Sequence, residues 1–148
     1  MMLLRPEVAM TSVRIETFIE AGLPTLRGDR GQLEQIILNL VRNAMEAIAS
    51  NRQQNGCVTV AARRSKIPSN LEISVHNNGP GMDPEIIAHI FEPLVSSKEK
   101  GLGLGLPICA SIVEAHGGRL WLERSKPDGT EFRLSVPFDG VRNTNAGN

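Results

Sequence analysis

The feature that most constrains the fold is the stretch "DRGQLEQIILNLVRNAMEAIAS", residues 29–50. Apolar residues recur in it at the spacing of one helical face, which predicts an amphipathic helix. Asp29 and Gln32 form a capping-box pattern at its start. The apolar face comprises Leu33, Ile36, Ile37, Leu40, Val41, Ala44 and Ile48. Such a face must be covered by another element, so the rest of the chain has to supply a partner layer.

That layer is predicted to be a sheet. Strand patterns occupy residues 12–20, 57–63, 71–77, 118–125 and 130–138. A short helix is expected from Asp83 to near Phe91, and a longer one over 106–118, with Pro107 in its first turn and Gly117 as its stop. Consecutive strands joined by short polar turns favour antiparallel pairing. The predicted fold class is α+β, a two-layer sandwich of a mostly antiparallel mixed sheet with helices on one face.

Charge and composition exclude several classes of partner. Lys+Arg and Asp+Glu number 16 each, and aromatic residues make up 3% of the chain, so neither a basic surface nor stacking platforms for nucleic acid are expected. Cys57 and Cys109 show neither metal-ligand nor disulfide spacing, which suits a reducing compartment. No apolar run approaches the roughly 20 residues that a bilayer span needs. We expect a cytoplasmic domain without membrane contact.

Polar residues interrupt the inward phase of two strands. Asn77 shares a strand face with Leu71, Ile73 and Val75, and Thr130 shares one with the apolar residues of the last strand. A buried amide or hydroxyl needs a hydrogen-bond partner. Two interpretations of Asn77 stay open: it caps the turn "NNGPG", or it faces a ligand.

A polar line also runs along the long helix. Gln35, Asn39 and Asn43 follow one another at intervals of four residues, and Asn43 falls at the edge of the apolar face. These residues either form a solvated face or hold a ligand. Asparagine is a weak helix former, and its amide oxygen suits Mg²⁺, so we favour a magnesium ligand at Asn43.

The segment "KEKGLGLGLPI", residues 98–108, alternates glycine with leucine before a helix. It matches neither the P-loop pattern nor GxGxxG, and alone it is as typical of a linker as of a phosphate site. It adjoins a helix N-terminus, where backbone N–H groups attract anions, and Lys98 and Lys100 add positive charge. With the polar strand and helix positions, it indicates a nucleoside triphosphate.

Five motifs resemble, in order and spacing, those of the catalytic ATP-binding domain of sensor histidine kinases. They are "NLVRNA" (39–44), "NNGPGM" (77–82), "FEPLVSSK" (91–98), "GLGLGL" (101–106) and "DGTEF" (128–132), and the resemblance covers about Leu23 to Phe138. The third motif and "IVEAHGGRLW" are most similar to PAS-linked nitrogen- and oxygen-regulatory kinases. The resemblance implies the Bergerat ATP-binding fold of the GHKL superfamily, with ATP and Mg²⁺ as ligands.

The resemblance also implies a role for each matched residue. Asn43 would coordinate Mg²⁺ with Asn39 assisting, while Asn77 would meet the adenine amino group and Thr130 would support the same pocket. Phe91 would anchor the near end of a lid. The residues implied in backbone approach to the nucleotide, or in the hinge and phosphate cradle, are Gly79, Gly81, Lys98, Gly101, Leu102, Gly103, Leu104 and Gly105. Those implied in catalysis are Gln35, Asn39, Asn43 and Lys98.

The chain departs from the family in two places. The family usually carries aspartate where this chain has Asn77, which predicts weaker ATP binding and a smaller preference for adenine over guanine. His76, His89 and His116 do not match the family's phosphoacceptor motif, a histidine followed by Glu or Asp.

The expected function is phosphoryl transfer from MgATP to a histidine on a separate dimerisation domain, with a response regulator downstream. An ATP hydrolase of the GHKL type is one alternative, although Asn39 replaces the glutamate that activates water there. A non-catalytic nucleotide-binding module is another. Residues 1–10 would follow a missing histidine-bearing hairpin, 11–139 would form the catalytic domain, a monomer when isolated, and 140–148 a flexible tail.

Overall fold

The computed structural model describes residues 13–23, 30–50, 55–92 and 105–138. Its sheet has the order β1-β2-β3-β5-β4. The strands are β1 (Arg14–Ile19), β2 (Cys57–Arg64), β3 (Asn70–Asn77), β4 (Arg119–Lys126) and β5 (Gly129–Pro137). β1 pairs with β2 in parallel, and the other pairs are antiparallel. The predicted mixed, mostly antiparallel sheet is confirmed.

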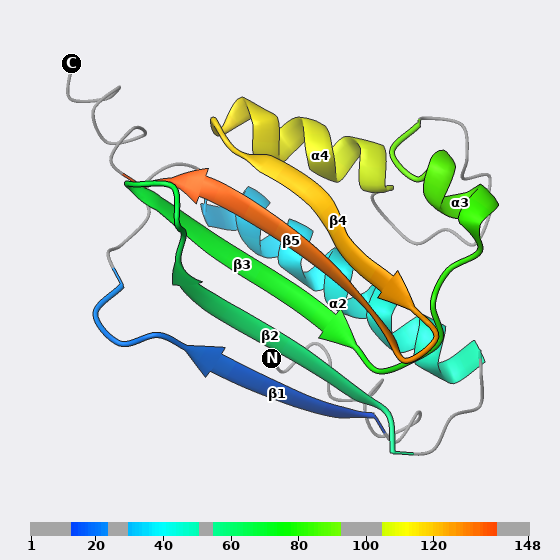
Figure 1. Ribbon diagram of the computed structural model, residues 1–148. Helices are drawn as coiled ribbons and strands as arrows, with labels where there is room; N and C mark the ends of the chain where they lie inside the picture. The colour runs from blue at the N-terminus through cyan, green and yellow to red at the C-terminus, as the bar shows by residue number, and fades with distance from the viewer. Residues whose placement is uncertain (1–12, 24–29, 51–54, 93–104, 139–148) are drawn as a thin grey trace.

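The helices α2 (Arg30–Ser50) and α4 (Leu106–Ala115) cover one face of the sheet. α2 packs on β2 and β3, α4 packs on β4 and β5, and the two helices touch each other (Figure 1). A shorter helix, α3 (Pro84–Ala88), follows β3 and ends three residues before Phe91, where the sequence pattern had placed its end. His89 follows it as a non-helical cap, so the remaining residues to Phe91 form turns rather than helix.

The core lies between this helical layer and the sheet. Ile36 and Ile48 of α2, Val113 of α4 and Leu134 of β5 are fully buried there. Burying the apolar face of α2 against β2 and β3 is worth about 25 cal/mol for each Å² of apolar surface removed from water. The predicted apolar face of the long helix is therefore confirmed, with Ile37 only partly buried at its edge.

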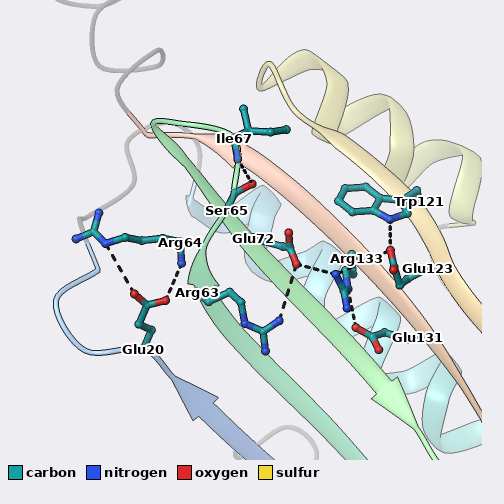
Figure 2. Close-up of polar contacts among 10 residues, drawn as sticks. All are labelled: Glu20, Arg63, Arg64, Ser65, Ile67, Glu72, Trp121, Glu123, Glu131 and Arg133. Atoms are coloured by element: carbon teal, nitrogen blue, oxygen red, sulfur yellow. Dashed lines mark hydrogen bonds and ion pairs between the residues drawn. The ribbon is translucent and has the colours of Figure 1, made fainter.

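The opposite face of the sheet carries an ion-pair network (Figure 2). Glu72 on β3 accepts from Arg133 on β5 at 3.2 Å and lies 3.9 Å from Arg63 on β2. Arg133 donates in turn to Glu131 at 2.7 Å, and this hydrogen bond raises the pKa of its guanidinium. These residues alternate along their strands with buried ones, so one face of the sheet packs on helices and the other faces solvent.

Several predictions fall outside the described residues. They are the helix cap at Asp29, the lead segment 1–10, the tail 140–148 and most of the glycine-rich segment, including Lys98, Gly101, Leu102, Gly103 and Leu104. In the part of the chain that the structure describes, no helix has the length and apolar character needed to cross a membrane.

Candidate functional site

Two buried polar residues meet at one end of the helix-covered face. Asn77 is the last residue of β3 and lies directly opposite Thr130, near the start of β5. Their exposed fractions are only 5% and 4%, because both share their strand faces with core residues. The prediction that they point inward is confirmed, and the strand register brings them together.

The side chain of Asn77 is only half satisfied. Its Oδ1 accepts a hydrogen bond from the Gly79 N–H at 2.8 Å, which closes the turn after β3. Its Nδ2 has no hydrogen-bond partner among the described residues. The turn-capping interpretation is therefore correct for the carbonyl oxygen, while the buried amide nitrogen stays available to a ligand.

Thr130 belongs to a short chain of hydrogen bonds that ties the loop after β3 to the β4–β5 hairpin. The Met82 N–H donates to Ser125 Oγ at 2.8 Å, and Ser125 Oγ lies 3.2 Å from Thr130 Oγ1. Thr130 Oγ1 donates to the Pro80 carbonyl at 3.4 Å. Thr130 therefore supports the loop rather than offering a free hydroxyl. Sequence reasoning missed Ser125, whose only signal is its place opposite Thr130 across the hairpin.

Gly79 and Gly81 also have a packing role within the protein, besides the predicted approach to a nucleotide. A Cβ on Gly81 would lie 2.7 Å from the carbonyl oxygen of Lys126, next to the hairpin turn. A Cβ on Gly79 would lie 3.0 Å from Asn77 Oδ1 and 3.2 Å from Ile48 Cγ1. Both glycines let the loop lie tightly against the protein itself, which holds the Asn77 amide in place.

The polar line on α2 turns inward along its length. Gln35 is exposed, Asn39 is buried at 6% exposure, and Asn43 is half-buried. Asn39 Nδ2 donates to Cys109 Sγ on α4 at 3.5 Å, so this amide joins the two helices. Within the described ranges, the Asn43 side chain has no hydrogen-bond partner, and its amide oxygen is free to bind a ligand at the edge of the core.

Cys109 lies in an apolar environment under α4. It is fully buried, and this burial raises the pKa of its thiol, while the hydrogen bond from Asn39 acts in the opposite direction. The thiol is therefore neutral at physiological pH and is a poor nucleophile there.

We expect this buried thiol to make stability fall at high pH. A raised pKa in the folded state means that the stabilisation is complete below the unfolded thiol's pKa, about 8.5, and is lost as the pH rises through the folded value. Urea unfolding between pH 7 and 10 should show a steeper loss in the wild type than in Cys109→Ala, by at most about 1.4 kcal/mol per pH unit. Parallel pH profiles for the two proteins would contradict this.

At the other end of the site, Gly105 is the N-cap of α4, and Pro107 lies in the first turn as predicted. The φ of Gly105, −77°, is open to any residue. A Cβ on Gly105 would meet only Pro107 Cδ, at 3.5 Å, among the described residues. The local backbone therefore does not require glycine at this position. If glycine is required at position 105, the reason is the close approach of a phosphate group to the backbone, as the predicted phosphate cradle implies.

Phe91 follows α3 and packs against the core. Its ring meets that of Phe132 on β5 edge-to-face, with the centroids 6.4 Å apart. This contact fixes the position of Phe91 against the sheet.

A metal would find few protein ligands in the described part of the chain. No group of three or more His, Cys, Asp or Glu side chains there could hold one. Asn43 offers a single free amide oxygen. That suits a Mg²⁺ ion which keeps its waters and arrives with a polyphosphate, and it does not suit a metal held by the protein alone.

Comparison with known proteins identifies relatives over most of the chain. The profile of the "Histidine kinase-, DNA gyrase B-, and HSP90-like ATPase" family matches residues 28–140. The sensor protein FixL of Bradyrhizobium diazoefficiens is 33% identical over 126 residues, 85% of this chain and 24% of FixL. The sensory histidine kinase/phosphatase NtrB of Rhizobium meliloti is 36% identical over 135 residues, 84% of this chain and 35% of NtrB. The chain thus spans about a third or less of the length of these relatives.

Solved structures share the fold. The nucleotide-free catalytic domain of the histidine kinase ThkA has a TM-score of 0.76 at 27% identity, covering 93% of this chain and 86% of that one. Full-length ShkA in complex with AMPPNP has a TM-score of 0.77 at 31% identity, covering 93% of this chain and 28% of that one. ThkA in complex with the response regulator TrrA has a TM-score of 0.73 at 27% identity, covering 93% and 37%.

Proposed function

Because this chain belongs to the family of histidine kinase-, DNA gyrase B- and HSP90-like ATPases, we propose that it binds MgATP and transfers the γ-phosphoryl group to a histidine of a separate dimerisation domain. The observation that carries the proposal is a pair of unsatisfied amides on the helix-covered face. One is Nδ2 of Asn77 at the end of β3, and the other belongs to Asn43 on α2. The ShkA–AMPPNP complex supports a nucleotide as the ligand.

In this proposal the two amides hold opposite ends of the nucleotide. Asn77, backed by the Thr130 network, contacts the base, and Asn43 holds the metal that accompanies the triphosphate. Mg²⁺ would neutralise charge on the phosphate oxygens. Gly79 and Gly81 shape the loop beside the base, Phe91 anchors the lid, and Lys98 with the segment from Gly101 through Leu102, Gly103 and Leu104 to Gly105 would enclose the phosphates.

The proposed reaction requires little acid–base catalysis from the residues of this chain. The bond between the γ-phosphorus and the bridging oxygen breaks, a bond from phosphorus to an imidazole nitrogen forms, and ADP leaves. A neutral imidazole attacks through its unprotonated nitrogen, so no base has to remove a proton from the attacking atom. Gln35, exposed on α2, can orient the incoming ring without taking a proton.

The environment of Asn39 favours transfer over hydrolysis. Hydrolysis needs a general base to activate water, and an amide cannot act as one. Asn39 is also buried, and its amide donates to the neutral Cys109 thiol, which is a poor general base at physiological pH. A hydrolase is therefore the second candidate, with a non-catalytic nucleotide-binding module as the third.

The proposal extends to partners and compartment. The ThkA–TrrA complex supports a response regulator as the downstream partner, and ATP as substrate implies a cytoplasmic domain. The histidine would come from a dimerisation hairpin, because His76, His89 and His116 do not match the phosphoacceptor motif.

The test is to mix the chain with [γ-³²P]ATP, Mg²⁺ and a separate polypeptide carrying a histidine-kinase dimerisation hairpin. We expect acid-labile label on the hairpin and none on a hairpin whose histidine is replaced by glutamine. Release of free phosphate without labelled hairpin would identify a hydrolase instead. Intact bound ATP would identify a binding module.

A further inference from the structure

We propose that the nucleotide site accepts 6-oxopurine triphosphates, the hypoxanthine and guanine class, at least as tightly as ATP. The residue that decides this is Asn77. The inference rests on the proposed function, because it takes Asn77 to be the residue that contacts the base.

The orientation of the Asn77 amide is fixed by the turn that it closes. Its carbonyl oxygen accepts from the Gly79 N–H at 2.8 Å, and rotating the amide by half a turn would set two donors against each other there. The nitrogen is consequently the group that stays unsatisfied. At 5% exposure the side chain has little contact with water in the free protein.

The surroundings leave Asn77 little freedom to adapt. A Cβ on Gly79 would be in close contact with both Asn77 Oδ1 and Ile48. The loop at Gly79 therefore packs tightly against the Asn77 amide. The hydroxyl of Thr130, the facing residue, already bonds with Ser125 and the Pro80 carbonyl. The one polar group in this cluster that still lacks a partner among the described residues is therefore a hydrogen-bond donor.

A donor selects an acceptor on the base. Hypoxanthine and guanine carry an oxygen at position 6, which accepts from an amide nitrogen. Adenine carries an amino group there, and two donors would face each other unless the base shifted to offer its N1 acceptor or to share the carbonyl oxygen that Gly79 already uses. Leaving a buried donor without its acceptor weakens binding by roughly 5- to 150-fold.

Calorimetry with paired nucleotides tests the inference. ITP and ATP differ only in the ring substituent at position 6 and the protonation of the neighbouring ring nitrogen, so a difference in affinity reports on the hydrogen bonds along this edge of the base. With Mg²⁺ present, the wild type should bind ITP as tightly as ATP or more tightly, by up to about 10-fold. GTP should follow ITP if the 2-amino group is accommodated.

Asn77→Asp should reverse this order. One carboxylate oxygen keeps the bond from Gly79 and the other accepts from the adenine amino group, so ATP should bind more tightly than ITP by about 10-fold or more. Asn78→Asp is the matched control: it adds the same charge one residue away, where Oδ1 accepts from the Cys57 N–H, and should leave the ATP/ITP ratio at the wild-type value. Thermal unfolding checks that each variant folds.

Two failures are distinguishable. If the wild type binds ATP more tightly than ITP, the inference is overturned, while the proposed function stands. If the folded wild type binds none of the three triphosphates, the proposed function is wrong and the inference falls with it. The wild-type comparison alone decides the matter should Asn77→Asp fail to fold.

Discussion

Asn43→Ala is expected to abolish the magnesium dependence of ATP binding and to weaken binding of MgATP by at least the roughly 10- to 100-fold that follows when even the surroundings of a metal site are altered. The Asn43 amide is half-buried and has no partner among the described residues, so its removal breaks no internal hydrogen bond. Alanine is also the better helix former. The free energy of unfolding should therefore stay within about 1 kcal/mol of the wild type or rise slightly.

Titration calorimetry with Mg²⁺ and with EDTA measures this directly. The variant should show the same weak affinity in both conditions, whereas the wild type should lose affinity only when the metal is removed. Glu46→Ala, an exposed position on the same helix, should behave as the wild type does. If Asn43→Ala still binds ATP in a magnesium-dependent way, Asn43 is not the magnesium ligand.

Gly118→Ala is expected to destabilise the fold by about 3 kcal/mol or more, at or above the upper end of what overpacking usually causes. A Cβ at this position would collide with the Ser135 carbonyl oxygen, at the point where β4 begins to pair with β5. Backbone atoms cannot move aside as a side chain can. The β4–β5 pairing next to Leu134, which is fully buried, would have to separate.

Chemical denaturation followed by circular dichroism gives the free energy of unfolding. Gly105→Ala is the matched control, since a Cβ there has room and the change should stay within about 1 kcal/mol. If Gly118→Ala unfolds at the same denaturant concentration as the control, the strands do not approach each other as closely as described.

Much of the fold was predictable because its signals are local. The spacing of apolar residues on α2 matches the 3.6-residue period of a helix. The alternation that places Leu71, Ile73 and Val75 on one face of β3 matches the two-residue period of a strand. The inward phase of Asn77 and Thr130 follows from the same alternation. The end of α3 was misplaced because a run of turns after Ala88 resembles a continuing helix in sequence.

The inward position of the polar strand residues was predictable, and their contacts were not. Asn77 and Thr130 were identified from polarity alone, yet their pairing is a matter of strand register. The bond between Asn39 and Cys109 joins two residues that lie 70 positions apart in sequence, on different helices, and no local pattern indicates it. Ser125 gave no separate signal, because a serine before a turn is common.

By itself, the sequence determined which segments are helix or strand, which faces they bury, and the family to which the chain belongs, because periodicity and motifs are properties of neighbouring residues. Only the tertiary structure decided the strand order, the close contact between Gly118 and Ser135, and the direction in which the Asn77 amide points. These depend on register and on distances between distant segments. A hydrogen bond forms or fails over a few tenths of an ångström, so the arrangement of donors and acceptors is settled only when the chain has packed.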